Sequence, residues 1–191
     1  MTSRTLITGF GPFGDNKENP SGILSSCFNR DHAVLEVSYK YVYEFWDALE
    51  KEGGYDTIIC LGLAAKAPRM RLELFARNNV GQTPDVHGET WSTDFIVHEG
   101  PPCLGSTVMP PDLIFAASAL LDARTLELST NPGDYLCNFL YYLLLAGHPG
   151  QVGFIHIPPF EVMKPELQYE TIAKLLISAE ALGETTQDKA A

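Results

Sequence analysis

The chain has few positively charged residues, with 13 Lys and Arg against 24 Asp and Glu and a net charge of −11 over 191 residues. Binding to nucleic acid or to an anionic membrane depends on clustered Lys and Arg, and the sequence contains no such cluster. Its four cysteines lie far apart and form no CxxC pair, which argues against a disulfide scaffold or a zinc site. We therefore expect a small molecule or a peptide as the partner, with no nucleic acid and no membrane.

Long apolar runs and low-complexity segments are missing as well. No apolar stretch approaches the length of a bilayer span, and residues 1–7 reach Thr8-Gly9 too soon for the apolar core of a signal peptide. With 45% hydrophobic residues, 16 Gly and 13 Pro, the composition is that of a globular protein without repeats. We expect a cytoplasmic protein with a single domain over residues 1–182 and a frayed tail over 183–191.

Strand and helix signals alternate along the chain. Apolar and alternating runs predict strands at residues 5–9, 33–42, 57–61, 69–77 and 152–157. Caps, prolines and helical spacing predict helices at residues 20–29, 45–52, 110–122, 134–146 and 165–182, and residues 78–107 are expected to be rich in loops. This order predicts an α/β fold, a single-domain three-layer α/β/α sandwich with a mixed, mostly parallel twisted sheet and a site near the strand ends.

Cys137 follows the helix-starting run Asn131-Pro132-Gly133-Asp134 and opens a long apolar stretch. If Asp134 caps this helix, Cys137 lies in the first turn, where free N–H groups and the macrodipole favour a thiolate. His156, on a short apolar strand, would supply a base, and Glu73 a carboxylate that orients the imidazole. Each residue also has a simpler interpretation, since Cys137 and His156 fit a core and Glu73 fits a solvent-facing strand position.

Four segments, in this order, resemble the pyroglutamyl peptidase I family: Thr8 to Gly14 with Asn19-Pro20-Ser21, Leu72 to Asn78, Tyr135 to Asn138, and Gly153 to Pro158. The resemblance implies a cysteine peptidase that hydrolyses the amide bond after an N-terminal pyroglutamyl residue through an acyl-enzyme. It places the catalytic roles on Glu73, Cys137 and His156, requires no metal or other cofactor, and makes a peptide with N-terminal pyroglutamate the partner. Family members occur as monomers and as tetramers, so a homo-oligomer and a monomer both remain open.

The resemblance also gives the first loop a role in substrate binding. It implies that Phe10 and Phe13 line the pocket for the lactam ring, which suits a flat neutral ring because aromatic walls bury it well. Asn19 is a further candidate for substrate binding. The structural alternative is that Phe10 and Phe13 pin a tight turn to the core and that Asn19 caps the following helix.

The chain departs from the family in three places, one of which is the segment between Cys137 and His156, a few residues shorter than usual. The family carries an Ala-Arg-Ile-Pro-Asp-like run after the glutamate, whereas Val80 to Asp85 is one residue shorter and lacks the arginine; Arg71 and Arg77 are the candidates to replace its charge. Many bacterial members have Gly-Gln-Ala where this chain has Gly62-Leu63-Ala64. Two alternatives therefore stay open: a divergent member that hydrolyses another small N-acyl or lactam-like amide, and a catalytically silent ligand-binding homologue.

Overall fold

The computed structural model describes residues 4–14, 17–108 and 124–187 of the chain. In this part of the chain a central six-stranded sheet has the strand order β2-β1-β3-β8-β4-β7. Its strands are β1 (Thr5–Phe10), β2 (Asp31–Leu35), β3 (Thr57–Leu63), β4 (Met70–Glu73), β7 (Leu126–Ser129) and β8 (Gln151–Ile157). Neighbouring strands pair in parallel, except that β4 and β8 are antiparallel. The predicted mixed, mostly parallel sheet is confirmed.

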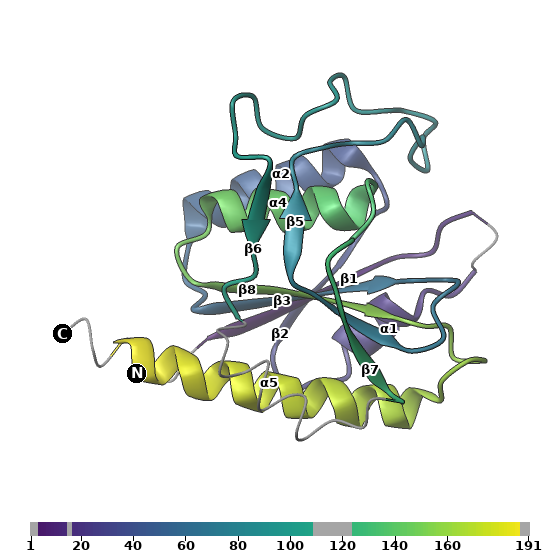
Figure 1. The fold of residues 1–191 in the computed structure, drawn as a ribbon, viewed down its shortest axis with the longest axis vertical. Coiled ribbons are helices and arrows are strands. Elements are labelled where there is room, and N and C mark those ends of the chain that lie inside the picture. Colours follow the sequence, from purple (N-terminus) through teal and green to yellow (C-terminus); the bar gives the residue numbers. More distant parts are fainter. Residues whose placement is uncertain (1–3, 15–16, 109–123, 188–191) are drawn as a thin grey trace.

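Helices cover both faces of this sheet, as Figure 1 shows. The helices α2 (Tyr39–Glu52) and α4 (Leu136–Gly147) pack on one face, and α1 (Pro20–Ser25) and α5 (Pro165–Gln187) pack on the other. A second, two-stranded antiparallel sheet of β5 (Phe75–Arg77) and β6 (Cys103–Gly105) lies against α4. The three-layer α/β/α arrangement is therefore confirmed.

Strand alternation decides which face each side chain of β8 joins. Phe154 packs in the core formed with α2 and α4, whereas Ile155 and Ile157 pack in the core formed with α1 and α5. Successive side chains of a strand point to opposite faces of the sheet. His156 therefore lies on the α4 face, one step beyond Phe154 towards the carboxyl end of the strand.

The prediction of a strand over residues 33–42 is wrong in its second half, because β2 ends at Leu35 and α2 begins at Tyr39. The Ser38 hydroxyl accepts a hydrogen bond from the Tyr41 N–H over 3.4 Å and so caps α2. The apparent alternation after Ser38 thus belongs to the first turn of a helix. Helix α1 ends at Ser25, short of the predicted residue 29, and α5 continues beyond the predicted residue 182 to residue 187.

The predicted strand over residues 69–77 is divided at Leu74 into β4 and β5, which belong to different sheets. The Leu74 N–H donates to the Ser129 carbonyl over 2.8 Å, while its own carbonyl accepts from the Ser106 N–H over 2.9 Å. Leu74 is thus the point where the chain passes from one sheet to the other. The strands β6 and β7, of three and four residues, were not predicted because such short runs carry little periodicity. The predicted helix over residues 110–122 lies outside the described residues.

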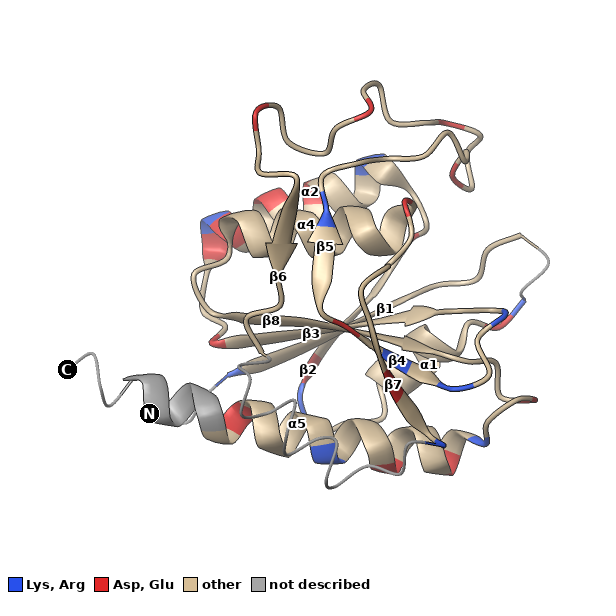
Figure 2. Cartoon of the chain, in the orientation of Figure 1, with Lys and Arg blue, Asp and Glu red and all other residues tan. Residues whose placement is uncertain are grey.

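The excess of acidic residues is spread over the surface. Figure 2 shows Asp and Glu on the helices and on the loop above α2 and α4, with Lys and Arg scattered singly among the described residues. Within the described part of the chain, no helix combines the length and the apolar character that crossing a membrane requires.

Candidate active site

The structure brings together the three residues to which the sequence assigned catalytic roles. The Nδ1 atom of His156, on β8, lies 2.8 Å from the Oε1 atom of Glu73, the last residue of β4. The side chain of Cys137, in the first turn of α4, lies beside His156 and interacts with the imidazole strongly enough to help raise its pKa. Glu73 is fully buried and His156 is 7% exposed, so the carboxylate and the imidazole meet out of contact with bulk water.

The pairing of β4 with β8 explains how Glu73 meets His156. In the antiparallel register, Glu73 lies opposite Phe154 and Arg71 lies opposite His156. Met70 and Leu72 pack into the core on the α5 side, so the alternate residues of β4 face α4. Glu73 and His156 are therefore diagonal neighbours on the same face, a separation that a long side chain can bridge.

The environment of His156 favours its charged form. Burial opposes the imidazolium, but the hydrogen bond and charge interaction with Cys137, and then those with Glu73, outweigh it and raise the pKa of His156 to about 9. The second oxygen of Glu73, Oε2, is buried without a hydrogen-bond partner among the described residues. The carboxylate thus directs its hydrogen bonding to the imidazole, the contact that fixes ring orientation in cysteine and serine hydrolases.

The helix that carries Cys137 begins without a side-chain cap. The prediction that Asp134 caps it is wrong, because the N-cap residue is Tyr135 and no side chain accepts a hydrogen bond there. Asp134 instead faces the loop after β5, where its carbonyl accepts the Gly81 N–H over 2.7 Å. The N–H groups of the first turn of α4 are therefore left without a capping side chain close to the Cys137 sulfur, at the positive end of the helix dipole.

Gly62 is a site residue that the sequence analysis did not assign. It lies on β3 in register with His156, and a Cβ atom at this position would be 2.7 Å from the Cys137 sulfur and 2.8 Å from the ring of Phe154. Only glycine leaves room for the sulfur beside the imidazole. The signal was a glycine inside a buried apolar strand, which often marks a close approach of another group.

The first loop places Phe10 and Phe13 on the Cys137 side of the sheet. Phe10 is 3% exposed within the core formed with α2 and α4, and Phe13 packs against that core while partly exposed. Asn19 caps α1 by accepting the Ser21 N–H, and its amide donates to the Gly11 carbonyl over 2.9 Å. These hydrogen bonds agree with the helix-cap interpretation of Asn19 and also close the loop.

Val80 to Asp85, the segment that lacks the family arginine, is hydrogen-bonded to α2. The buried carboxylate of Asp85 accepts the Tyr39 N–H at the start of α2 and two N–H groups of its own turn. Burial opposes the charge, but these backbone hydrogen bonds hold the pKa of Asp85 below its usual value. Tyr135, the N-cap residue of α4, donates to the Pro84 carbonyl over 3.0 Å, which connects this segment to the start of the Cys137 helix.

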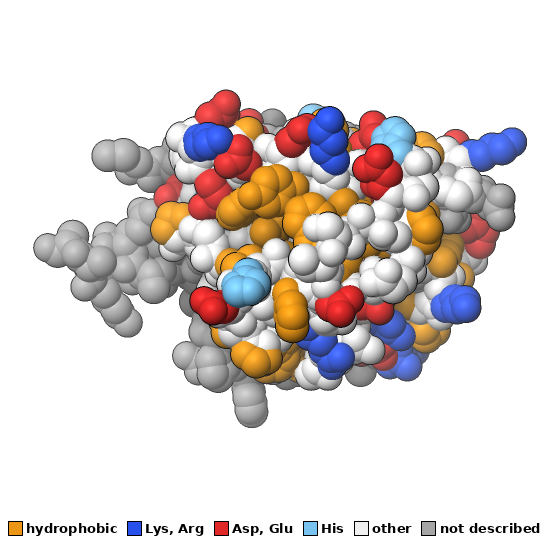
Figure 3. Space-filling view, turned by 90° about the horizontal axis from the view of Figure 1, so that it is seen from above, with side chains coloured by type: hydrophobic (Ala, Val, Ile, Leu, Met, Phe, Trp, Pro, Cys, Tyr) orange, Lys and Arg blue, Asp and Glu red, His pale blue; other side chains and the backbone are white. Residues whose placement is uncertain are grey.

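Aromatic side chains add packing contacts at the start of α4. Trp91 packs edge-on against Phe139 with ring centroids 4.7 Å apart, and Tyr39 does so at 5.3 Å. Phe139 lies two positions after Cys137, so the loop containing Trp91 packs over the first turn of α4. Figure 3, seen from this side, shows hydrophobic side chains gathered in the middle of the face, with charged side chains around them.

The two arginines considered as replacements for the family arginine are engaged elsewhere. Arg71 donates from Nε to Glu127 over 2.8 Å, and Arg77 donates from Nη2 to the Thr130 carbonyl over 3.1 Å. Among the described residues, neither forms a hydrogen bond or ion pair with Glu73. The replacement of the arginine therefore remains a prediction.

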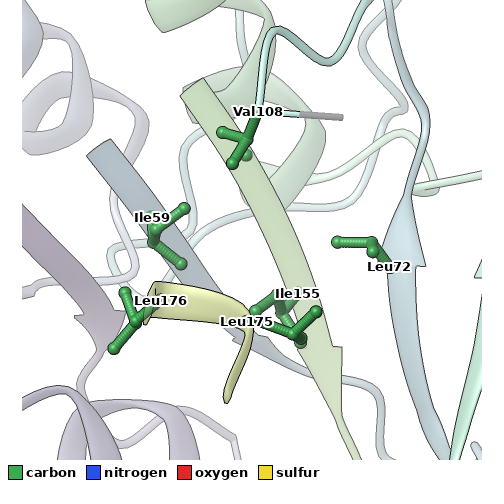
Figure 4. A pocket seen from close by; sticks show the side chains of 7 residues that line it. Ile59, Leu72, Val108, Ile155, Leu175 and Leu176 are labelled. Carbon is green, nitrogen blue, oxygen red and sulfur yellow. The ribbon is translucent and has the colours of Figure 1, made fainter. Parts of the chain in front are cut away.

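A small cavity on the opposite face of the sheet does not belong to this site. Figure 4 shows its apolar side chains, which come from the sheet, from α5 and from Val108 after β6, and which enclose a volume of about 20 Å³. A space of this size holds at most a water molecule, and its apolar lining offers no hydrogen-bond partners. Among the described residues, no group of three or more His, Cys, Asp or Glu side chains is arranged to hold a metal ion.

The chain is similar in sequence to known proteins. The model of the pyroglutamyl peptidase family matches residues 3–178. The pyrrolidone-carboxylate peptidase of Thermococcus onnurineus is 30% identical over 190 residues, covering 90% of this chain and 94% of that protein. Human pyroglutamyl-peptidase 1 is 25% identical over 163 residues, covering 81% of this chain and 78% of that protein.

A solved structure supports the same relationship. The crystal structure of pyrrolidone carboxyl peptidase from Thermus thermophilus superposes with a TM-score of 0.77 and 31% sequence identity. The match covers 92% of this chain and 99% of that one. The similarity therefore extends over most of the chain, and Glu73, Cys137 and His156 lie within the residues that the family model matches.

Proposed function

The chain belongs to the pyroglutamyl peptidase family, and from this premise we propose that it hydrolyses the amide bond after an N-terminal pyroglutamyl residue, with Cys137 as nucleophile. The observation that carries the proposal is the 2.8 Å contact between Glu73 and His156 beside the Cys137 side chain. These three groups supply a nucleophile, a proton donor and acceptor, and a carboxylate that orients the imidazole.

In the acylation step, the Cys137 thiolate attacks the carbonyl carbon that joins pyroglutamate to the next residue. The carbonyl oxygen gains the negative charge of the tetrahedral intermediate, and the uncapped N–H groups of the first turn of α4 stabilise it. The His156 imidazolium then donates its proton to the leaving amine as the C–N bond breaks. The shortened peptide leaves, and a thioester remains on Cys137.

In the deacylation step, neutral His156 takes a proton from water while the water oxygen attacks the thioester carbonyl. The C–S bond breaks, free pyroglutamate leaves, and the thiolate and imidazolium are restored. Glu73 holds Nδ1 of the ring and stabilises the imidazolium in both steps through the hydrogen bond of 2.8 Å. The thiolate and the imidazolium complete this chemistry between them, so we expect no metal or other cofactor.

Specificity for a blocked N-terminus would come from the first loop. Phe10 and Phe13 would provide apolar walls for the lactam ring, on the same side of the sheet as Cys137. A charged N-terminal amine would lose hydration in such a pocket without a compensating partner, whereas the neutral lactam would not. Asn19 would contribute by holding the loop closed through its hydrogen bond to Gly11.

We place the reaction in the cytoplasm, on peptides that carry pyroglutamate at their N-terminus. The excess of acidic over basic residues makes a nucleic acid an unsuitable partner. Whether the active protein is a monomer or a tetramer is answered directly by light scattering of the purified protein.

The test is the release of a fluorophore from a pyroglutamyl amide. We expect the wild-type protein to release it and Cys137→Ala to lower kcat/KM by at least about 10⁴-fold, because the acyl-enzyme can no longer form. The control is Cys27→Ala, which removes an exposed thiol in the turn after α1 and should retain activity.

Other outcomes separate the alternatives. Release from another N-acyl amide, but not from the pyroglutamyl amide, would identify a divergent hydrolase of the same family. If no amide is hydrolysed and Cys137 is alkylated no faster than Cys27, the protein is a catalytically silent homologue and the proposal is wrong.

A further inference from the structure

Asn138, the residue after Cys137, uses its whole side-chain amide on the strand that faces it. It is fully buried, and its Oδ1 atom accepts the Arg77 N–H over 2.8 Å. Its Nδ2 group donates to the Arg77 carbonyl over 2.8 Å and to the Asn79 carbonyl over 3.0 Å. One side chain of α4 thus satisfies three backbone groups at the end of β5.

The hydrogen bonds of Asn138 with Arg77 lie on the edge of β5 that faces away from β6. Strand β5 pairs with β6 on one side only, and the Asn138 amide meets the N–H and C=O of Arg77 on the other side, as a neighbouring strand would. The Asn138 side chain, in the first turn of α4, therefore sets the distance between the helix and β5 and the position of the helix along the strand.

Tyr141 makes a second connection one turn further along α4. It is fully buried, and its hydroxyl donates to the backbone carbonyl of Glu73 over 3.0 Å. Residues three apart lie on the same face of a helix, so Asn138 and Tyr141 both form hydrogen bonds with the stretch of chain from Glu73 to Asn79. Burial raises the pKa of Tyr141, so the hydroxyl remains a neutral donor.

The backbone groups that Tyr141 and Asn138 bind lie on either side of Leu74, where the chain leaves the six-stranded sheet for β5. Building on the proposed peptidase chemistry, we propose that Asn138 and Tyr141 are positioning residues that fix the Cys137 sulfur relative to Glu73 and His156. Their hydrogen bonds go to backbone groups of Glu73, Arg77 and Asn79. They set the position of the nucleophile helix against the segment that ends in the catalytic carboxylate.

The neighbouring Asn78 provides a control, because it is also a buried asparagine but forms its hydrogen bonds with a different segment. It is 7% exposed, its Oδ1 accepts the N–H groups of Ile96 and Val97, and its Nδ2 donates to the carbonyls of Val97 and Gly100. These four hydrogen bonds hold the loop after β5, and none of them goes to α4. Asn78→Ala therefore removes four buried hydrogen bonds, against three in Asn138→Ala, and none of the four joins the nucleophile helix.

The experiment compares Asn138→Ala with Asn78→Ala in the full chain. For each variant we would measure the melting temperature, kcat and KM on a pyroglutamyl amide, and the pH profile of Cys137 alkylation by iodoacetamide. We expect both variants to melt earlier, but only Asn138→Ala to lower kcat, on the order of 10²-fold with KM little changed, because misplacement of a reacting atom costs rate more than binding. Its alkylation profile should also shift, while that of Asn78→Ala should match the wild type.

A second variant, Tyr141→Phe, removes one hydroxyl and keeps the buried ring. We expect kcat to fall by roughly 3- to 10-fold in the same direction, since a single hydrogen bond to Glu73 is lost. If Asn138→Ala does not fold, this variant decides the question by the same measurements. Equal loss of kcat in Asn138→Ala and Asn78→Ala, or an unchanged alkylation profile in the folded α4 variants, would overturn the positioning role.

The alkylation measurement keeps this inference separate from the proposed substrate. If the wild-type protein does not hydrolyse the pyroglutamyl amide, but Asn138→Ala changes the Cys137 alkylation profile and Asn78→Ala does not, the substrate is wrong and the positioning role holds.

Discussion

The two faces of the central sheet carry different kinds of core. On the α5 side, β3 and β8 contribute Ile59, Leu61, Ile155 and Ile157, which pack against apolar residues of α1 and α5. On the α4 side, the same stretch of sheet contributes His156, and β4 adds the fully buried Glu73. Alternation along each strand produces this difference, since neighbouring residues serve opposite faces.

The difference shows how the fold accommodates a buried charged group. Removing a carboxylate and an imidazolium from water costs free energy, but the interactions of His156 with Cys137 and Glu73 offset this cost for the imidazolium, since the pKa of His156 is raised. The apolar face opposite them stabilises the sheet by ordinary burial of hydrophobic surface. The sheet that carries His156 and Glu73 on one face is therefore also stabilised by the apolar core on its other face.

The largest expected effect comes from removing the charge on the α4 face. Glu73→Gln keeps the shape of the side chain but loses the carboxylate that supports the imidazolium, so we expect kcat/KM to fall roughly 10³- to 10⁴-fold. Kinetics on a pyroglutamyl amide measure this. The control is Glu127→Gln, which removes the partner of Arg71 on the neighbouring strand and should leave kcat/KM near the wild-type value. Equal losses in both variants would contradict the assigned role of Glu73.

A glycine-to-alanine substitution on each face of the sheet compares the two faces directly. In Gly62→Ala the new methyl group would meet the Cys137 sulfur at 2.7 Å, and in Gly153→Ala it would meet a Val108 methyl at 2.8 Å on the opposite face. We expect Gly62→Ala to displace the sulfur and lower kcat on the order of 10²-fold. Gly153→Ala should lower the melting temperature but retain kcat. The contrast fails if Gly153→Ala loses as much kcat as Gly62→Ala.

The smallest effect is the pH dependence of the wild-type protein. Because the pKa of His156 is raised to about 9, kcat/KM should decline above that pH as the imidazole loses the proton that the leaving amine needs. A raised pKa also means that His156 stabilises the folded state fully below its ordinary pKa of 6.5, and that this stabilisation is lost as the pH rises through about 9.

Two profiles measure this effect, one of kcat/KM and one of the free energy of unfolding from urea titrations. His156→Ala should flatten the corresponding part of the stability profile. A kcat/KM that stays constant well above the pKa of His156 would show that another group donates the proton.

Local patterns in the sequence identified much of the site. The segments around Cys137, His156 and Glu73 carried the family resemblance, and the apolar run before Gly62 marked a buried strand. The roles of Asn138 and Tyr141 were not visible, because their hydrogen-bond partners lie 61 and 68 positions away. An asparagine and a tyrosine in an apolar helix look the same from the sequence whether they bond to a strand or fill a core.

The sequence by itself determined where strands and helices alternate, and hence the class of fold, because side-chain periodicity and helix caps act within a few residues of the chain. Only the tertiary structure decided that the chain turns at Leu74 from one sheet to the other and that Asp134 faces a loop instead of capping α4. Both depend on hydrogen bonds between distant segments. The meeting of Glu73, Cys137 and His156 is of the same kind, since an antiparallel register and a helix anchored to a strand bring them together.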